Sequence, residues 1–271
     1  MRRTILSAAL AGALAAGVLA PRGAHAERNG PVPVPEVKIL EETVPVYDPM
    51  KGIAMGISGL YERTVANTGG RTAKIYASKD AYLGAYVVFL TTPEGQETAT
   101  WLAESGWIER ADEEKLVLYV LEPGASGEWG TPAEELPYVE TAVYHFADAR
   151  GNYYQPSESY YAVGYDAGGA ALQQAVMKDP ILFAAGAFVD ASDISSQFLD
   201  TLDTDFYATP DWDGNQVPSS EVPMPVWLIN SEGSPNADGV VDHWKQANQT
   251  GKKATGGFKL CPLSDPDCNK R

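Results

Sequence analysis

The stretch SYYAVGYDAGGAALQQAVMK, residues 159–178, decides the fold because it changes from strand to helix character within a few residues. Its first part, Ser159–Gly164, is an aromatic and apolar run that predicts a buried strand. A helix is predicted over Gly168–Lys178. The glycines at the two ends of the intervening turn allow a tight backbone bend, which presents the side chain of Asp166 above the sheet.

The same alternation of short apolar runs and helical patterns continues on both sides of this turn. It predicts an α/β fold with a mostly parallel sheet flanked by helices. The other predicted elements are strands over Arg71–Ala77, Tyr86–Thr91, Leu116–Leu121, Phe183–Val189 and Met224–Ile229, and helices over Glu97–Ser105, after the capping residue Thr131, and over Asp238–Asn248.

Composition favours one globular domain without nucleic-acid partners. Of 271 residues, 44% are hydrophobic, which suffices for a large core. Asp and Glu number 36 against 20 Lys and Arg, a net charge of −16. Such a chain is repelled by nucleic-acid phosphates and by anionic membrane surfaces. After the first residues, no apolar run has the length of a membrane span.

The beginning of the chain has the pattern of a secretory signal peptide over residues 1–26. Arg2 and Arg3 form a positive end, Ile5–Ala20 is apolar, and Ala24-His25-Ala26 is a small-x-small cleavage site. The arginine pair leaves twin-arginine export open as an alternative. We expect a secreted or periplasmic protein with a Pro-rich lead over residues 27–60 and a folded domain over residues 61–271.

Two cysteines and one acidic stretch suggest possible cross-links or ion sites. Cys261 and Cys268 are an even pair in an oxidising compartment, which predicts a disulfide, and a metal site would need more ligands than these two thiols. The stretch Asp211-Trp212-Asp213-Gly214-Asn215 partly matches a calcium loop, but it lacks the distal acid. We interpret it as an acidic surface turn, and predict neither a metal site nor a cofactor.

The turn Gly164-Tyr165-Asp166-Ala167-Gly168 resembles the nucleophile elbow, G-x-S-x-G, of the α/β-hydrolase fold, with aspartate in the serine position. Over about Tyr61–Asn248 the chain is similar to secreted polyhydroxybutyrate-depolymerase-like and feruloyl-type esterases. The motifs that carry this likeness are Tyr61-Glu62-Arg63, Tyr86-Val87-Val88, Pro93-Glu94-Gly95, Ser105-Gly106-Trp107, Ala111-Asp112 and Leu121-Glu122-Pro123.

This resemblance implies roles for individual residues. Asp166 takes the position of the nucleophile, and Glu232, after the strand Met224–Ile229, takes that of the triad acid. The oxyanion hole would use the backbone N–H of Ala167 and one from the loop Thr92–Gly95, for which Thr92 is the candidate. The resemblance implies a small-molecule or polymeric ester as the ligand.

No histidine matches the third triad position. His25 leaves with the signal peptide and His145 precedes the elbow. His243 belongs to a helical stripe with Val240, Trp244 and Ala247, which predicts a packed side chain. Two explanations stay open: the active site is degenerate, or a C-terminal segment bearing the histidine is missing from this sequence.

Asp166 itself has three interpretations. It could be a helix N-cap, where a carboxylate accepts hydrogen bonds from free N–H groups. It could be a nucleophile, as in epoxide hydrolases and haloalkane dehalogenases, which also need a histidine. It could have another role, such as cation binding.

Two classes of function follow from these observations. The first is an esterase lineage that is impaired or inactive as this chain stands. The alternatives are a non-catalytic binding protein for ester, acyl or polymer ligands, and an Asp-nucleophile hydrolase.

Overall fold

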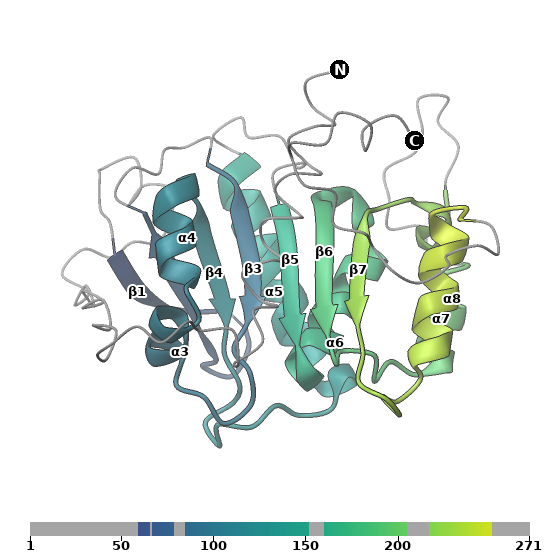
Figure 1. Cartoon of the computed structure of the whole chain (residues 1–271), viewed down its shortest axis with the longest axis horizontal. Coiled ribbons are helices and arrows are strands. Elements are labelled where there is room, and N and C mark those ends of the chain that lie inside the picture. Colours follow the sequence, from purple (N-terminus) through teal and green to yellow (C-terminus); the bar gives the residue numbers. More distant parts are fainter. Residues whose placement is uncertain (1–58, 66, 79–84, 152–159, 205–216, 251–271) are drawn as a thin grey trace, which may run out of the picture.

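The computed structural model describes residues 59–250, except for 66, 79–84, 152–159 and 205–216. In this part of the chain seven strands form one sheet in the order β1-β2-β4-β3-β5-β6-β7 (Figure 1). Strand β2 is antiparallel to both neighbours, and β4, β3, β5, β6 and β7 are mutually parallel. The strands are β1 Gly59–Thr64, β2 Thr72–Ala77, β3 Val87–Thr91, β4 Val117–Leu121, β5 Tyr160–Tyr165, β6 Phe183–Val189 and β7 Val226–Ile229.

Helices cover both faces of the sheet (Figure 1). They are α3 Thr98–Glu104, α4 Trp107–Glu114, α5 Pro132–Gly151, α6 Asp166–Lys178, α7 Ser196–Thr201 and α8 Ala237–Ala247, with 3-10 turns η2 Pro180–Leu182 and η3 Ser219–Glu221. Among the described residues, no helix combines the length and the apolar character needed to cross a membrane.

The core consists of two apolar layers separated by the sheet. Alternate residues of β3 show the division: Val87 and Phe89 pack in the layer that includes α5 and α6, whereas Val88 and Leu90 pack in the layer of α3 and α4. All five residues of β3 are buried, as are all five of β4. Burial on both faces explains why these strands have continuous apolar runs in the sequence.

The α/β fold predicted from the sequence is confirmed, and each predicted strand and helix is present with ends shifted by at most two residues where they are described. The two-residue shifts are at β7, predicted from Met224 and observed from Val226, and at α6, predicted from Gly168 and observed from Asp166. Three of the strands and helices in the described residues were not predicted: β1, α4 and α7. Helix α7 has only six residues, and none of them is buried. Strand β1 begins at Gly59, inside the stretch assigned to the Pro-rich lead, and pairs only with β2. Helix α4 is short and acidic, and only three of its residues are buried.

The carboxyl group of Asp179 is buried where α6 ends. Burial raises the pKa of Asp179 to about 6, against the opposing effect of a hydrogen bond with the Tyr144 side chain. One carboxyl oxygen, Oδ1, has no hydrogen-bond partner. The fold therefore favours the neutral form of a group that is ionised at neutral pH.

We predict that Asp179→Asn stabilises the protein at pH 7.5 and does little at pH 4. The folded pKa lies above the unfolded value of about 3.9, so ionisation lowers the free energy of unfolding progressively between about pH 4 and pH 6. The amide avoids this cost, and the gain at pH 7.5 is on the order of 1–3 kcal/mol. Urea unfolding at both pH values measures it, with the exposed Asp193→Asn as control. An equal effect at the two pH values would contradict the prediction.

Candidate functional site

The predicted elbow lies at the carboxyl end of β5, where the chain turns directly into α6 (Figure 1). Asp166 is the first residue of α6, and its φ of +53° lies in the left-handed region that residues other than glycine rarely adopt. The N-cap is Tyr165, without a side-chain capping hydrogen bond, so the interpretation of Asp166 as the N-cap is wrong. The N–H of Tyr165 donates to Oγ1 of Thr91 at 2.8 Å, which ties the turn to β3.

Three glycines let the strand and the helix approach each other closely. A Cβ atom on Gly164 would lie 2.6 Å from Cα of Gly169, and one on Gly169 would lie 2.5 Å from the carbonyl carbon of Gly164. A Cβ atom on Gly168 would lie 2.3 Å from the indole ring of Trp129. Real Cβ atoms do not come this close to other atoms, so glycine is required at all three positions.

The Asp166 carboxyl group is half-buried at the turn. Its pKa is raised, chiefly because burial removes water and additionally because the carboxylate of Asp190 is near. A hydrogen bond from the backbone N–H of Glu94 acts in the opposite direction and stabilises the charged form. Within the loop after β3, the backbone of Glu94 is thus the group that favours the charged form of Asp166.

The structure does not leave the N–H group of Thr92 free for a ligand. The candidate proposed from the resemblance, Thr92, has its N–H group bonded to the carbonyl oxygen of Leu121 at 3.0 Å, and its side chain is fully buried. Its N–H is therefore committed to the backbone between β3 and β4. Ala167 follows Asp166 in the first turn of α6, where backbone N–H groups lack partners within the helix.

The structure brings Asp190, rather than Glu232, next to the elbow. Glu232 is exposed in the turn after β7. Asp190 follows β6, the neighbour of β5, and accepts hydrogen bonds from Oγ of Ser231 at 2.8 Å and Oγ of Ser234 at 3.0 Å. Partial burial acts to raise the pKa of Asp190, but the hydrogen bonds from the two serines outweigh it and lower the pKa.

Sequence reasoning missed Asp190, although a signal for it was present. The predicted strand Phe183–Val189 ends immediately before this residue, and parallel strands end at the same edge of a sheet.

His243 packs in the core, as its helical stripe predicted. Val240, His243, Trp244 and Ala247 are the buried residues of α8. The imidazole meets the indole ring of Trp244 edge-on at 5.0 Å, and burial lowers the pKa of His243 to about 4, opposed by Asp203. In the sheet, β6 and β7 follow β5, and Figure 1 shows α8 at the end of the sheet beyond β7.

Some predicted features lie outside the described part of the chain. They are the signal peptide, the cysteine pair Cys261 and Cys268, and the stretch Asp211–Asn215. The side chain of His145 is not described either. Among the described residues, no three His, Cys, Asp or Glu side chains are grouped so that they could hold a metal ion.

A polar cavity of about 420 Å³ lies beside the loop that carries Glu94. Its lining includes the turn Gly69–Gly70, the start of β2, the residues around the start of α3 and the segment after β4. Gln96 and Glu97, in the loop between β3 and α3, line the cavity.

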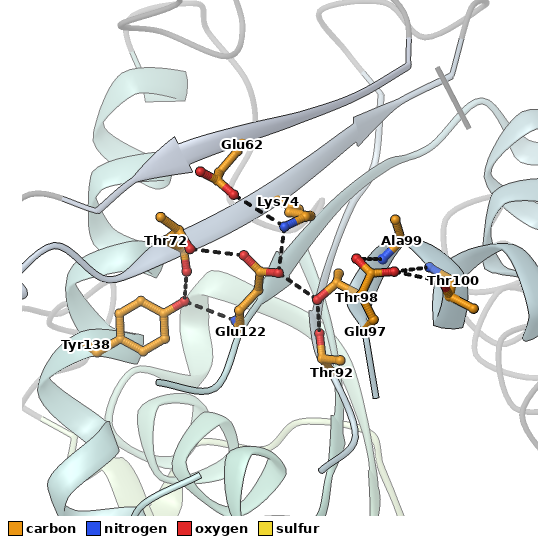
Figure 2. Close-up of polar contacts among 10 residues, drawn as sticks. All are labelled: Glu62, Thr72, Lys74, Thr92, Glu97, Thr98, Ala99, Thr100, Glu122 and Tyr138. Atoms are coloured by element: carbon orange, nitrogen blue, oxygen red, sulfur yellow. Dashed lines mark hydrogen bonds and ion pairs between the residues drawn. The ribbon is translucent and has the colours of Figure 1, made fainter. Parts of the chain in front are cut away.

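Charged groups at this cavity are paired with one another (Figure 2). Nζ of Lys74 contacts the carboxylates of Glu122 at 2.9 Å and Glu62 at 3.3 Å. The pKa of Lys74 is raised: burial acts to lower it, but hydrogen bonds and attraction from these two carboxylates outweigh burial. Arg71 pairs with Glu135 at 2.8 Å and lies 4.1 Å from the centre of the Tyr138 ring.

Comparisons with known proteins find similar structures but no similar sequences. No protein-family model matches this sequence, and no curated protein matches it. A poly(3-hydroxybutyrate) depolymerase from Bordetella parapertussis is similar at 16% identity and a TM-score of 0.45, over 74% of this chain and 81% of that one. An acetyl xylan esterase from Aspergillus awamori is similar at 15% identity and a TM-score of 0.42, over 52% of this chain and 56% of that one.

A butyrate-bound esterase from Thermogutta terrifontis is similar at 10% identity and a TM-score of 0.42, over 69% of this chain and 78% of that one. The fold is assigned from the topology of this chain rather than from these likenesses. A mostly parallel sheet, helices on both faces and a strand-to-helix elbow after β5 make the fold α/β-hydrolase-like.

We predict that Gly169→Ala destabilises the protein by on the order of 1–3 kcal/mol or more, because its methyl group would overlap the backbone of Gly164. The usual helical preference for alanine over glycine, about 1 kcal/mol, is too small to offset that overlap. Gly124→Ala is the control, since its nearest neighbour is an oxygen 4.0 Å away. Urea unfolding compares the two variants, and equal stability of Gly169→Ala and the parent chain would refute the close contact.

Proposed function

We propose that this chain is an exported α/β-hydrolase-fold protein of the carboxylic-ester hydrolase type, polyhydroxybutyrate-depolymerase-like in lineage, that hydrolyses esters very poorly or not at all. One observation supports this most directly. The elbow carries Asp166 in the serine position, in the left-handed conformation of a tight strand-to-helix turn. The backbone of Glu94, in the loop that would supply an oxyanion hole, favours the charged form of the Asp166 carboxyl group. A negative charge at this position competes with the oxyanion of ester hydrolysis for backbone N–H donors.

The chemistry of a carboxylate nucleophile supports the same conclusion. Attack of Asp166 on an ester carbonyl would form a mixed anhydride, and the attacking charge would compete with the developing oxyanion for the same N–H groups. Turnover would then need a base for hydrolysis of the intermediate. His243 is packed against Trp244 in α8, with its pKa lowered to about 4 by burial. His243, the one histidine whose side chain is described, is therefore not available as this base.

A second candidate function is non-catalytic binding of an ester, acyl or polymer ligand. The cavity of about 420 Å³ favours it, since it lies beside the loop between β3 and α3 and has the volume of a small-molecule site. An Asp-nucleophile hydrolase is the third candidate. Ester turnover distinguishes the Asp-nucleophile hydrolase from the other two candidates.

We predict no measurable hydrolysis of p-nitrophenyl butyrate by the purified chain. Loss of a triad nucleophile or histidine costs on the order of 10⁶ in kcat, and triad members act as a unit. Asp166→Ser alone should therefore recover almost nothing, and Asp166→Ala should equal the parent chain. Turnover of several per second that Asp166→Ala abolishes would make Asp166 a working nucleophile and would overturn the proposal.

Export is tested by the mass of the protein recovered from outside the cytoplasm of an expressing cell. We expect a chain that begins near Glu27, with Cys261 joined to Cys268, since disulfides form in oxidising compartments. Intact mass before and after reduction measures both features. Cys261→Ser is the control, because it removes the mass change on reduction without altering cleavage. An uncleaved chain, or one with two free thiols, would contradict the expectation.

A further inference from the structure

The polar cavity of about 420 Å³ lies at the carboxyl end of β4, apart from the elbow. Strand β2 is antiparallel to β4, so the start of β2 meets the end of β4, and residues of both regions line the cavity together with the start of α3. Strands β4 and β3 stand between β2 and β5 in the sheet. None of the elbow residues 164–169 is among the described residues that line the cavity. The cavity is therefore a separate site with the volume of a small-molecule site.

The charged side chains around this cavity pair with one another. Nζ of Lys74 lies 2.9 Å from Oε1 of Glu122 and 3.3 Å from Oε2 of Glu62 (Figure 2). The guanidinium group of Arg71 pairs with Glu135 at 2.8 Å and donates a second hydrogen bond, also of 2.8 Å, to the backbone carbonyl oxygen of Glu122. A charged ligand would therefore have to displace one of these partners or lie beside a like charge.

The balance of charge around the cavity also disfavours a charged ligand. The charged side chains that line it are three carboxylates and two cations: Glu62, Glu97, Glu122, Arg71 and Lys74. The carboxylate of Glu97 is held by hydrogen bonds from two backbone N–H groups at the start of α3. An anion would be repelled by the excess of negative charge, and a cation would compete with Lys74 for the same carboxylates.

Hydrogen-bonding capacity remains at the ion pair of Lys74 and Glu122. An ammonium group has three N–H donors, and the two carboxylates beside Lys74 account for two of them. Oε1 of Glu122 accepts from Lys74 and from Oγ1 of Thr98 at 2.7 Å. Oε2 accepts from Oγ1 of Thr72 at 3.1 Å, its only partner among the described residues, although a carboxylate oxygen accepts about two hydrogen bonds. The described residues thus leave one donor of Lys74 and one acceptor position of Glu122 unused.

Hydroxyl groups of a ligand match this remaining capacity, because a hydroxyl group both donates and accepts. Neighbouring hydroxyl groups on a sugar ring can accept from Lys74 and donate to Glu122 without breaking the ion pair. Hydrogen bonds to ionised groups are about twice as strong as those between neutral groups. The ion pair already orders both side chains, which lowers the entropic cost of binding. A Cβ atom on Gly69, Gly70 or Gly127 would meet nothing within 4 Å, so this part of the wall leaves space for a ring.

We propose that the cavity binds a neutral polyhydroxylated ligand, a monosaccharide or the terminal unit of a polysaccharide, whose hydroxyl groups are bound by Lys74 and Glu122. This inference goes beyond the proposed function. It uses the same cavity as the non-catalytic binding candidate, but it requires neither an ester group in the ligand nor any role of the elbow.

NMR titration of the full chain with sugars of matched shape and different charge tests this proposal. Glucose and galactose are the neutral probes. The uronic acid and the 2-amino sugar of each, at pH 6, add a negative or a positive charge to the same ring. The backbone amide signals of four glycines in the lining report on the cavity: Gly69, Gly70, Gly124 and Gly127. The signal of Gly233, in the turn after β7, reports on the surface elsewhere.

We expect at least one neutral sugar to shift the cavity signals and to leave that of Gly233 in place. Half-saturation should lie on the order of 1 mM, an affinity that two charge-assisted hydrogen bonds of ordinary strength provide. Both charged forms of that sugar should bind more weakly, the uronic acid by about tenfold or more. The proposal is refuted if neither neutral sugar gives a saturable shift, if Gly233 shifts equally, or if a charged form binds as tightly as its neutral parent.

Two variants test the place and the contacts of the bound sugar. Gly124→Leu puts a side chain into the lining at a glycine without a positive φ, where a Cβ atom would come no closer than 4.0 Å to a neighbour, and should weaken binding at least about tenfold. Ser126→Leu is the matched control, since it adds the same side chain at an exposed position of the same segment outside the lining, and it should keep the parent affinity.

Lys74→Met removes the N–H donors and keeps the aliphatic stem, so it should also weaken binding about tenfold. Gly124→Leu decides the question if loss of the cation beside Glu122 unfolds that variant. Parent affinity in Gly124→Leu, or in a folded Lys74→Met, would overturn the proposal. None of these readouts depends on ester turnover, so an active parent enzyme would contradict the proposed function and leave this inference standing.

Discussion

The contact between the backbones of Gly164 and Gly169 is the constraint on which the rest of the site depends. Strand β5 runs through the interior of the sheet and α6 starts directly after its last residue, so helix and strand can pack only if no side chain separates them at this point. The left-handed φ of Asp166 is the local cost of that approach, and costs of this kind are about 1–3 kcal/mol. The same bend leaves the carboxyl group of Asp166 half-buried at the carboxyl end of β5.

The carboxylate of Asp166 makes this elbow negatively charged, unlike an elbow that carries a neutral serine. A serine hydroxyl is neutral until a base removes its proton, and it leaves nearby N–H groups free for a substrate oxygen. Asp166 brings its own negative charge, in a half-buried setting where Asp190 is close. The raised pKa of Asp166 and the lowered pKa of Asp190 show that the two carboxyl groups sit in unequal surroundings, although they end neighbouring strands.

Much of this arrangement could be predicted from the sequence. The remaining elements and contacts could not, for physical reasons. Buried strands such as β4 have continuous apolar runs, and the glycines around Asp166 indicate a tight turn. Edge strand β1 has Glu62 on its exposed side and pairs with one neighbour, so its pattern is weak. Contacts such as Glu94 with Asp166 join residues far apart in the chain, and periodicity holds no information on them. The role of Asp190 depends on Ser231 and Ser234, 41 and 44 residues away.

Trp129 touches two functional segments at once, and this limits how the protein can change over evolutionary time. Its indole N–H bonds to the carbonyl oxygen of Thr92, and its ring lies against Gly168. Surface connections usually tolerate insertions and deletions. The segment between β4 and α5 is an exception, because a change in its length would withdraw one side chain from both the loop after β3 and the start of α6. Three connections that are separate in sequence therefore have to vary together or stay the same length.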